Sequence, residues 1–177
     1  MRGTAERINR EARAEDVMMH ADDIPVAHTP AGGYGATMPA PILRGCTEAL
    51  AGGAPDLRGV WKVVSVEVDG QPAPADHPVR SHVERIEQCG DRVVVTAAGL
   101  IHDMRADGTP ENGVNDVSAV GHQPIQVVAT FESGVLVLRP VGMPGVEVTR
   151  HLEGEDLVWR YHSLFTARLR RVEAPSR

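Results

Sequence analysis

The sequence of 177 residues has few aromatic side chains, few cysteines and a single lysine. Its two cysteines, Cys46 and Cys89, are too few for a disulfide scaffold or a zinc site of four cysteines. One disulfide between them is an open alternative, but a reducing cytoplasm favours free thiols. No apolar run approaches 18 residues, so we expect no membrane-spanning helix. The polar first twenty residues lack the apolar stretch of a signal peptide, and we therefore expect a cytoplasmic protein.

The net charge, the hydrophobic fraction and the length of the chain exclude further classes of protein. The formal net charge of −6 argues against general nucleic-acid binding. A hydrophobic fraction of 42% excludes wholesale disorder. A chain of 177 residues suits one domain, which could bury roughly 70% of its unfolded surface. A self-sufficient core is therefore expected.

The first 57 residues differ in pattern from the rest. Residues 4–20 have helical spacing after the potential cap Thr4, which predicts a short helix. From 21 to 57, proline and glycine recur every few residues, which predicts an irregular arm. The arm also carries apolar side chains such as Tyr34 and Leu43, so we expect it to pack on something. Covering a pocket, exchanging onto a partner chain and staying loose are open alternatives.

From residue 58 the hydrophobic period becomes two, which indicates β-strands. We expect strands at 60–68, 81–88, 91–98, 100–105, 114–120, 124–132, 134–139, 145–152, 155–162 and 164–172. Turn signals separate them, and no helical segment intervenes. Because closure removes exposed sheet edges, the predicted fold of residues 58–173 is all-β, an antiparallel up-and-down β-barrel of about 8–10 strands. A two-sheet sandwich is the alternative.

Six aromatic side chains supply little bulk for the interior of such a barrel. A barrel of this size is either filled or holds one small ligand. The shortage of aromatics favours a hollow interior, although abundant valine and leucine could also fill it.

Several segments resemble the calycins, and among them the fatty-acid-binding branch. Residues 59–67 (GVWKVVSVE) resemble the family's opening strand, and residues 90–96 (GDRVVVT) resemble a later turn and strand. Residues 148–158 and 166–172 are similar to its closing hairpins. The resemblance covers about residues 58–173 and implies a β-barrel that binds a small hydrophobic ligand.

The resemblance also implies a binding site for the ligand's carboxylate. The family uses two arginines and a tyrosine near the C-terminus, and Arg150 and Arg168 match the two arginines. Arg170 stands at the tyrosine position, and residues 69–80 are too short and proline-rich for the family's helical lid. Both are departures from the family's pattern.

Strand alternation gives an independent view of the same residues. Arg150 shares a face with Val148, and Trp159 and Tyr161 share a face on the next strand, whereas the last strand leaves the face of Arg168 open. The residues expected to bind ligand are Arg150, Arg168, Tyr161, Trp159, Trp61 and His102.

Catalytic motifs are sparse, and the eight histidines form no recognisable metal motif. We expect no cofactor or metal. The predicted function is binding of a small, mainly apolar ligand such as an acid or a ketone. A cofactor-independent isomerase, cyclase or hydratase is the alternative, with Tyr161, His102, His82 and Asp103 as the first residues to test. A haem-binding barrel with an inward histidine is a further alternative, and a homodimer is an open possibility.

Overall fold

The computed structural model describes residues 19–175. The helix predicted over 4–20 therefore lies, apart from its last two residues, outside the described residues. The elements are η1 (Ala21–Asp23), β1 (Gly59–Val68), β2 (Gln71–Pro72), η2 (Pro78–Ser81), β3 (Val83–Cys89), β4 (Arg92–Ala97), β5 (Leu100–Arg105), β6 (Val114–Val117), β7 (Pro124–Glu132), β8 (Val135–Pro140), β9 (Val148–Glu153), β10 (Asp156–Tyr161) and β11 (Phe165–Glu173). Each predicted strand is present, with boundaries shifted by up to three residues.

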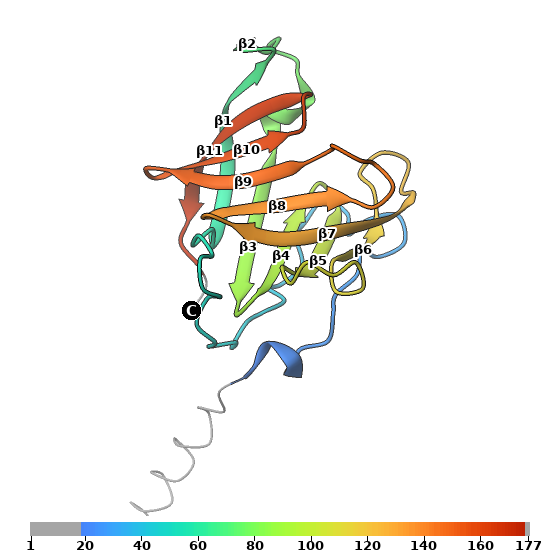
Figure 1. The fold of residues 1–177 in the computed structure, drawn as a ribbon. Coiled ribbons are helices and arrows are strands. Elements are labelled where there is room, and N and C mark those ends of the chain that lie inside the picture. Colours follow the sequence, from blue (N-terminus) through green and yellow to red (C-terminus); the bar gives the residue numbers. More distant parts are fainter. Residues whose placement is uncertain (1–18, 176–177) are drawn as a thin grey trace, which may run out of the picture.

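The strands form one antiparallel sheet that curls into a nearly closed barrel (Figure 1). Their order is β5-β4-β3-β1-β11-β10-β9-β8-β7-β6, and β2 pairs only with β1. The path ends at β5 and β6, which lie beside each other, although no ladder joins them in residues 19–175. The predicted all-β, up-and-down barrel is confirmed.

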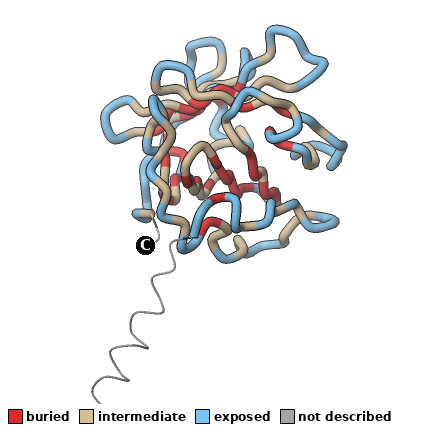
Figure 2. The backbone as a smooth tube through the Cα atoms, turned by 60° about the horizontal axis from the view of Figure 1, so that its bottom comes forward, coloured by how far each residue is buried: buried red, intermediate tan, exposed pale blue. Residues whose placement is uncertain are grey.

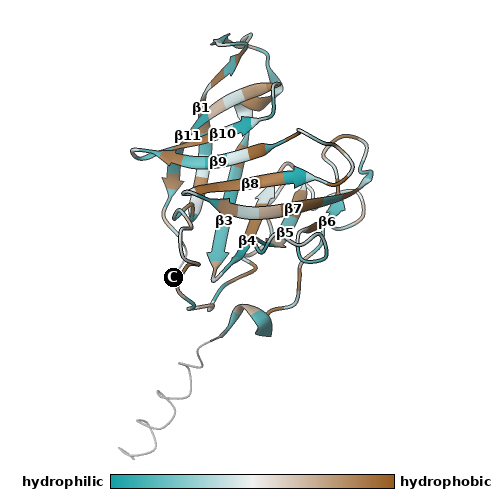
Figure 3. Cartoon of the chain, viewed as in Figure 1, coloured by the Kyte–Doolittle hydropathy of each residue, from teal (hydrophilic) through white to brown (hydrophobic). Residues whose placement is uncertain are grey.

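One face of every barrel strand points into a common apolar core. Figure 2 shows the buried segments in the middle of the molecule and the loops exposed, and Figure 3 shows hydrophobic stretches along β7 and β8. The largest fully buried side chains include Trp61, Leu57, Ile86, Met104 and Leu136. These side chains belong to one continuous hydrophobic cluster inside the barrel.

The arm packs on the outer face of β3, β4 and β5. Its apolar side chains form a second core cluster with residues of these strands: Ala21, Leu43, Cys89, Val94 and Ile101, with Ile24, Ala27, Tyr34, Ile42 and Cys46 packed against them. All six residues of β4 are consequently buried, on both faces of the sheet. The expectation that the arm packs on something is confirmed, and it covers a flank of the barrel.

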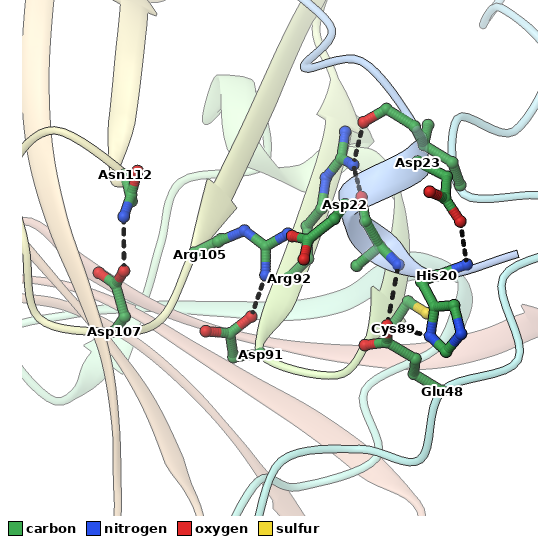
Figure 4. A network of polar contacts seen from close by, with 12 residues as sticks. His20, Asp22, Asp23, Glu48, Cys89, Asp91, Arg92, Arg105, Asp107 and Asn112 are labelled. Atoms are coloured by element: carbon green, nitrogen blue, oxygen red, sulfur yellow. Dashed lines mark hydrogen bonds and ion pairs between the residues drawn. The ribbon is translucent and has the colours of Figure 1, made fainter.

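Buried polar groups hold the arm in place. Arg92 is 2% exposed and donates to both carboxylate oxygens of Asp103, at 2.8 and 2.6 Å. It also donates to the carbonyl oxygens of Ala21, Ile24 and Pro25 at 2.6–2.9 Å, so all five of its N–H groups have partners. Figure 4 shows Arg92 beside a second link, in which Arg105 joins Asp22 of the arm to Asp91.

A disulfide joins Cys46 of the arm to Cys89 at the end of β3. The expectation of free thiols is therefore wrong. The sequence places these cysteines 43 residues apart and gives no sign of their contact. They meet because the arm returns across β3, where the backbone N–H groups of Ile42 and Leu43 donate to the Glu87 carboxylate at 3.1 and 2.9 Å.

The arm also closes the seam between β5 and β6. The backbone N–H of Thr29 donates to Asp116 of β6 at 3.0 Å, and the Thr29 hydroxyl accepts from the backbone N–H of Ile101 of β5 at 2.9 Å. His28 forms a β-bridge with His102 on the same edge. The arm thus connects two strands that lack a ladder.

Candidate functional site

The two ends of the barrel differ, and the base is the end at which the chain enters β1. There the indole N–H of Trp61 donates to the Leu57 carbonyl at 2.8 Å, and Gln88 accepts from the Leu57 N–H at 2.7 Å. The guanidinium of Arg171 lies 4.5 Å from the centre of the Trp61 ring. Trp61 is fully buried among these partners. The base is therefore a plug, and Trp61 belongs to it.

The opposite end, the mouth, carries an aromatic cluster. We define the mouth cluster as His77, His82, Trp159, Tyr161 and Phe165. Its ring centroids lie 4.5 Å apart for His82 and Trp159, 4.9 Å for Trp159 and Phe165, and 5.5 Å for the stacked pair Tyr161 and Phe165. Tyr161 is 39% exposed, so the cluster is open to solvent on one side.

His77 and His82 flank η2, the single helical turn between β2 and β3, and the aromatic residues come from β10 and β11. The turn packs its Val79 against the barrel core. Arg80 fixes the segment by donating to the carbonyl oxygens of Ala73 and Pro74. This short segment stands where the calycin resemblance implies a helical lid.

A buried ion pair lies beside the mouth cluster. Arg150 of β9 donates from Nε and Nη2 to the two carboxylate oxygens of Glu84 of β3, both at 2.9 Å. Glu84 is 0% exposed and Arg150 is 6% exposed. The Arg150 guanidinium also lies 5.0 Å from the centre of the Trp159 ring. Strands that are 66 residues apart in sequence are thus joined through the interior by a two-point contact.

The ion pair determines the protonation of Glu84. Burial raises the pKa of this carboxyl group, but the charge of Arg150 and the hydrogen bonds from His82 and Arg150 outweigh that effect. The resulting pKa is lowered to about 2. Glu84 is therefore ionised at neutral pH, and it holds the His82 ring through Nε2 at 2.9 Å.

His102 of β5 faces the same interior, as its alternation with Met104 indicated. Its Nε2 lies 2.9 Å from the carbonyl oxygen of Val117, across the seam. Burial lowers the pKa of His102, and the nearby charge of Arg150 acts in the same direction. The ring is accordingly held in its neutral form and connects β5 with β6.

The indole N–H of Trp159 is the unusual polar group of this site. Trp159 is 7% exposed, its Nε1 atom is buried, and Nε1 finds no hydrogen-bond acceptor within residues 19–175. An unpaired buried donor costs about 1–3 kcal/mol, which is why such groups are rare. Trp159 therefore carries a buried, unpaired donor within the mouth cluster.

Three residues singled out from the sequence lie away from the mouth cluster: Trp61 in the base, Arg168, and Asp103, which was a candidate only for the enzyme alternative. Arg168 is on the outer face of β11, where it pairs with Glu153 at 2.6 Å and with Asp156 at 3.5 Å. Asp103 points to the arm side of the sheet and pairs with Arg92, while its neighbour His102 points inward. Arg168 lies on the outer face because its neighbours Ala167 and Leu169, whose side chains point to the opposite face of β11, are buried in the core.

Glu84, His77 and Phe165 were not expected at the site. The sequence does place His82, Glu84 and Ile86 on one strand face, which was the available signal for Glu84. Its pairing with Arg150 depends on barrel closure, and that has no local signature.

Two half-open hollows lie outside the mouth cluster. One, of about 420 Å³, is next to Trp61 and is lined by Asp156, Arg170 and Arg171. The other, of about 460 Å³, lies between the arm and the start of β6 and reaches Met104. Neither of them confirms the prediction of a hollow interior.

The structure places no cluster of three or more potential metal ligands within residues 19–175. None of the helical turns in that part of the chain has the length and apolar character that a membrane crossing requires.

No protein-family model and no curated protein matches the chain. Among the solved structures that match, human cRBP IV aligns with 66% of this chain and 98% of its own. The two are 15% identical, with a TM-score of 0.46. The barrel itself, antiparallel and nearly closed, has the architecture that the resemblance to the calycins implies.

Proposed function

We propose that the protein binds one small, mainly apolar molecule at the mouth of the barrel. The observation that supports this most directly is the buried, unpaired indole N–H of Trp159 within an aromatic cluster that is partly open to solvent. Aromatic faces supply apolar contact, and one unpaired donor fixes the orientation of a ligand that carries an acceptor. The apolar part would contact Tyr161 and Phe165.

The size of the expected affinity follows from the buried area. A ligand that loses about 300 Å² of apolar surface to the mouth gains roughly 7 kcal/mol before the costs of association. Before those costs, 7 kcal/mol corresponds to a dissociation constant of about 10 μM, and each 1.4 kcal/mol of cost weakens binding tenfold, so dissociation constants of about a millimolar are expected for a simple eight-carbon ligand.

Binding is tested with the uncharged fluorescent probe N-phenylnaphthylamine. The wild-type protein should bind it saturably, and Tyr161→Ala should weaken binding about fivefold, since an aromatic contact contributes about 1 kcal/mol. Val172→Ala is the matched control, because Val172 is 55% exposed and lies toward the base end of β11. Absence of saturable binding, or equal effects of the two substitutions, would rule out the mouth as the site.

The contact between His82 and Glu84 favours a second candidate, an isomerase acting on a ketone. Glu84 holds Nε2 of His82, so Nδ1 could accept a proton from the carbon next to a carbonyl group. The charge of the resulting enolate would be stabilised by the Trp159 N–H. The test is exchange of those protons in deuterated water, which His82→Gln should abolish and His122→Gln, a surface control, should not.

The remaining expectations stay predictions. A disulfide is typical of oxidising compartments, so the bond between Cys46 and Cys89 does not support a cytoplasmic location. A homodimer and haem binding are untested. For haem, His82 and His102 each already have one ring nitrogen on a protein partner.

A further inference from the structure

The positive charge of Arg150 is already paired with the carboxylate of Glu84 inside the protein. Both oxygens of Glu84 receive hydrogen bonds from the guanidinium, and the pair is almost completely removed from solvent. A ligand carboxylate brought to Arg150 would approach a second carboxylate in a medium that screens charge poorly. It would also lose its own hydration without gaining an unpaired cation. The arginine that matches the family's carboxylate anchor is therefore occupied.

The unpaired group at the mouth is the indole N–H of Trp159, which, unlike Arg150, has no partner and requires a hydrogen-bond acceptor. An indole N–H only donates, so it pairs with an acceptor and not with an ammonium group or another N–H. It carries no net charge, and it lies in a cluster of rings beside the neutralised ion pair. A neutral acceptor oxygen fits this place without adding a buried charge.

We propose that the ligand is an uncharged molecule with a carbonyl or hydroxyl oxygen, and that Glu84 excludes carboxylates by occupying Arg150. This inference rests on the proposed binding at the mouth and specifies its ligand class. Trp159 donates to the ligand oxygen, and Glu84 acts as a specificity residue through Arg150. An internal carboxylate thus stands where the resemblance implies a bound fatty acid's carboxylate.

The experiment measures displacement of N-phenylnaphthylamine by four eight-carbon molecules: methyl hexyl ketone, octyl alcohol, octanoate and octylammonium. In the wild-type protein the ketone and the alcohol should displace the probe at concentrations about tenfold or more below those of the two ions. Tighter binding of octanoate than of the ketone would overturn the inference while leaving mouth binding intact. Failure of the probe itself to bind would instead overturn the proposed function.

Two variants test the assigned roles. Glu84→Gln should free the charge of Arg150 and strengthen octanoate binding about tenfold, whereas Glu153→Gln, which removes a carboxylate partner of the surface Arg168, should change nothing. Trp159→Phe should weaken ketone binding about threefold to tenfold, measured against the probe affinity of the same variant. Unchanged octanoate binding in a folded Glu84→Gln protein, or unchanged ketone binding in Trp159→Phe, would overturn the inference. Thermal unfolding shows whether each variant is folded. If Glu84→Gln does not fold, the wild-type ranking and Trp159→Phe decide the question alone.

Discussion

The two tryptophans show how one residue type takes different roles at the two ends of the barrel. The Trp61 indole donates to the Leu57 carbonyl and closes the base. The Trp159 indole N–H is also buried but has no acceptor within residues 19–175. Burial alone does not distinguish the two tryptophans, and the hydrogen-bond partner of the indole N–H does.

Acid should destabilise the protein through Glu84. Its pKa in the folded state is about 2, below the ordinary value of 4.5, so ionised Glu84 stabilises the folded state fully above pH 4.5. This contribution, on the order of 3 kcal/mol, is lost as the pH falls from 4.5 toward 2. His102 acts in the same direction, because its lowered pKa makes the folded state less stable as the pH falls below 6.5.

Urea unfolding at pH 7.5, 4.5 and 2.5 measures this loss. The Glu84→Gln variant is the comparison, since it lacks the titrating group and should lose less stability than the wild type between pH 4.5 and 2.5. Parallel curves for the two proteins would contradict the assignment.

Strand alternation correctly placed several individual side chains. It put Arg150 on the face of Val148, it put Trp159 and Tyr161 on one face of the next strand, and it separated His102 from Asp103. It could not identify Glu84 as the partner of Arg150, because that pairing crosses the interior between strands that are not adjacent in the sheet. Nor could it decide the face of Arg168, since both faces of β11 carry polar and apolar residues.

Among the elements, the arm is bound by one buried side chain at three of its carbonyl groups, that of Arg92. Arg92→Met should lower the free energy of unfolding by about 3 kcal/mol or more, because it leaves Asp103 buried without its counter-charge. The arm carbonyls that Arg92 now binds would also lose their donor. Urea unfolding checks the loss, and proteolysis within residues 21–57 should become faster.

Arg139→Met is the matched control for that experiment. Arg139 also pairs with two carboxylates, Glu132 and Glu147, but on the exposed surface, where such pairs contribute little. Similar losses in the two variants would show that the Arg92 network does not hold the arm.

Reduction of the disulfide should also loosen the arm. Its cysteines are 43 residues apart, and the chain-entropy model gives about 4 kcal/mol for a loop of this length. Urea unfolding with and without a reducing agent measures the difference. The double variant Cys46→Ser with Cys89→Ser should be insensitive to the reducing agent, and a wild-type midpoint that does not move would contradict the prediction.

The strands were predictable from the sequence and the arm's location was not. Period-two alternation is a local property, and it located every strand of the barrel path. The arm has no regular period, and its polar contacts include single long-range hydrogen bonds. Its backbone N–H groups donate to Glu87 and Asp116, and its backbone carbonyl groups accept from Arg92. Such contacts leave no pattern in the sequence of either partner.

For the whole molecule, these features combine into a barrel with a filled base, a covered flank and a chemically distinct mouth. The filled base follows from Leu57 and Trp61, and the covered flank explains why β4 is buried on both faces. Within residues 19–175, the mouth is the end of the barrel at which aromatic rings, an unpaired hydrogen-bond donor and the ion pair of Arg150 and Glu84 meet. The central claim is that an uncharged ligand binds there.

The most direct test is nuclear magnetic resonance of the two indole N–H groups during titration with methyl hexyl ketone. The chain contains two tryptophans, so Trp61 serves as the internal control within the same spectrum. We predict that the Trp159 signal shifts and saturates while the Trp61 signal stays in place. A Trp159 signal that does not move at excess ketone, or equal shifts of both signals, would contradict the account.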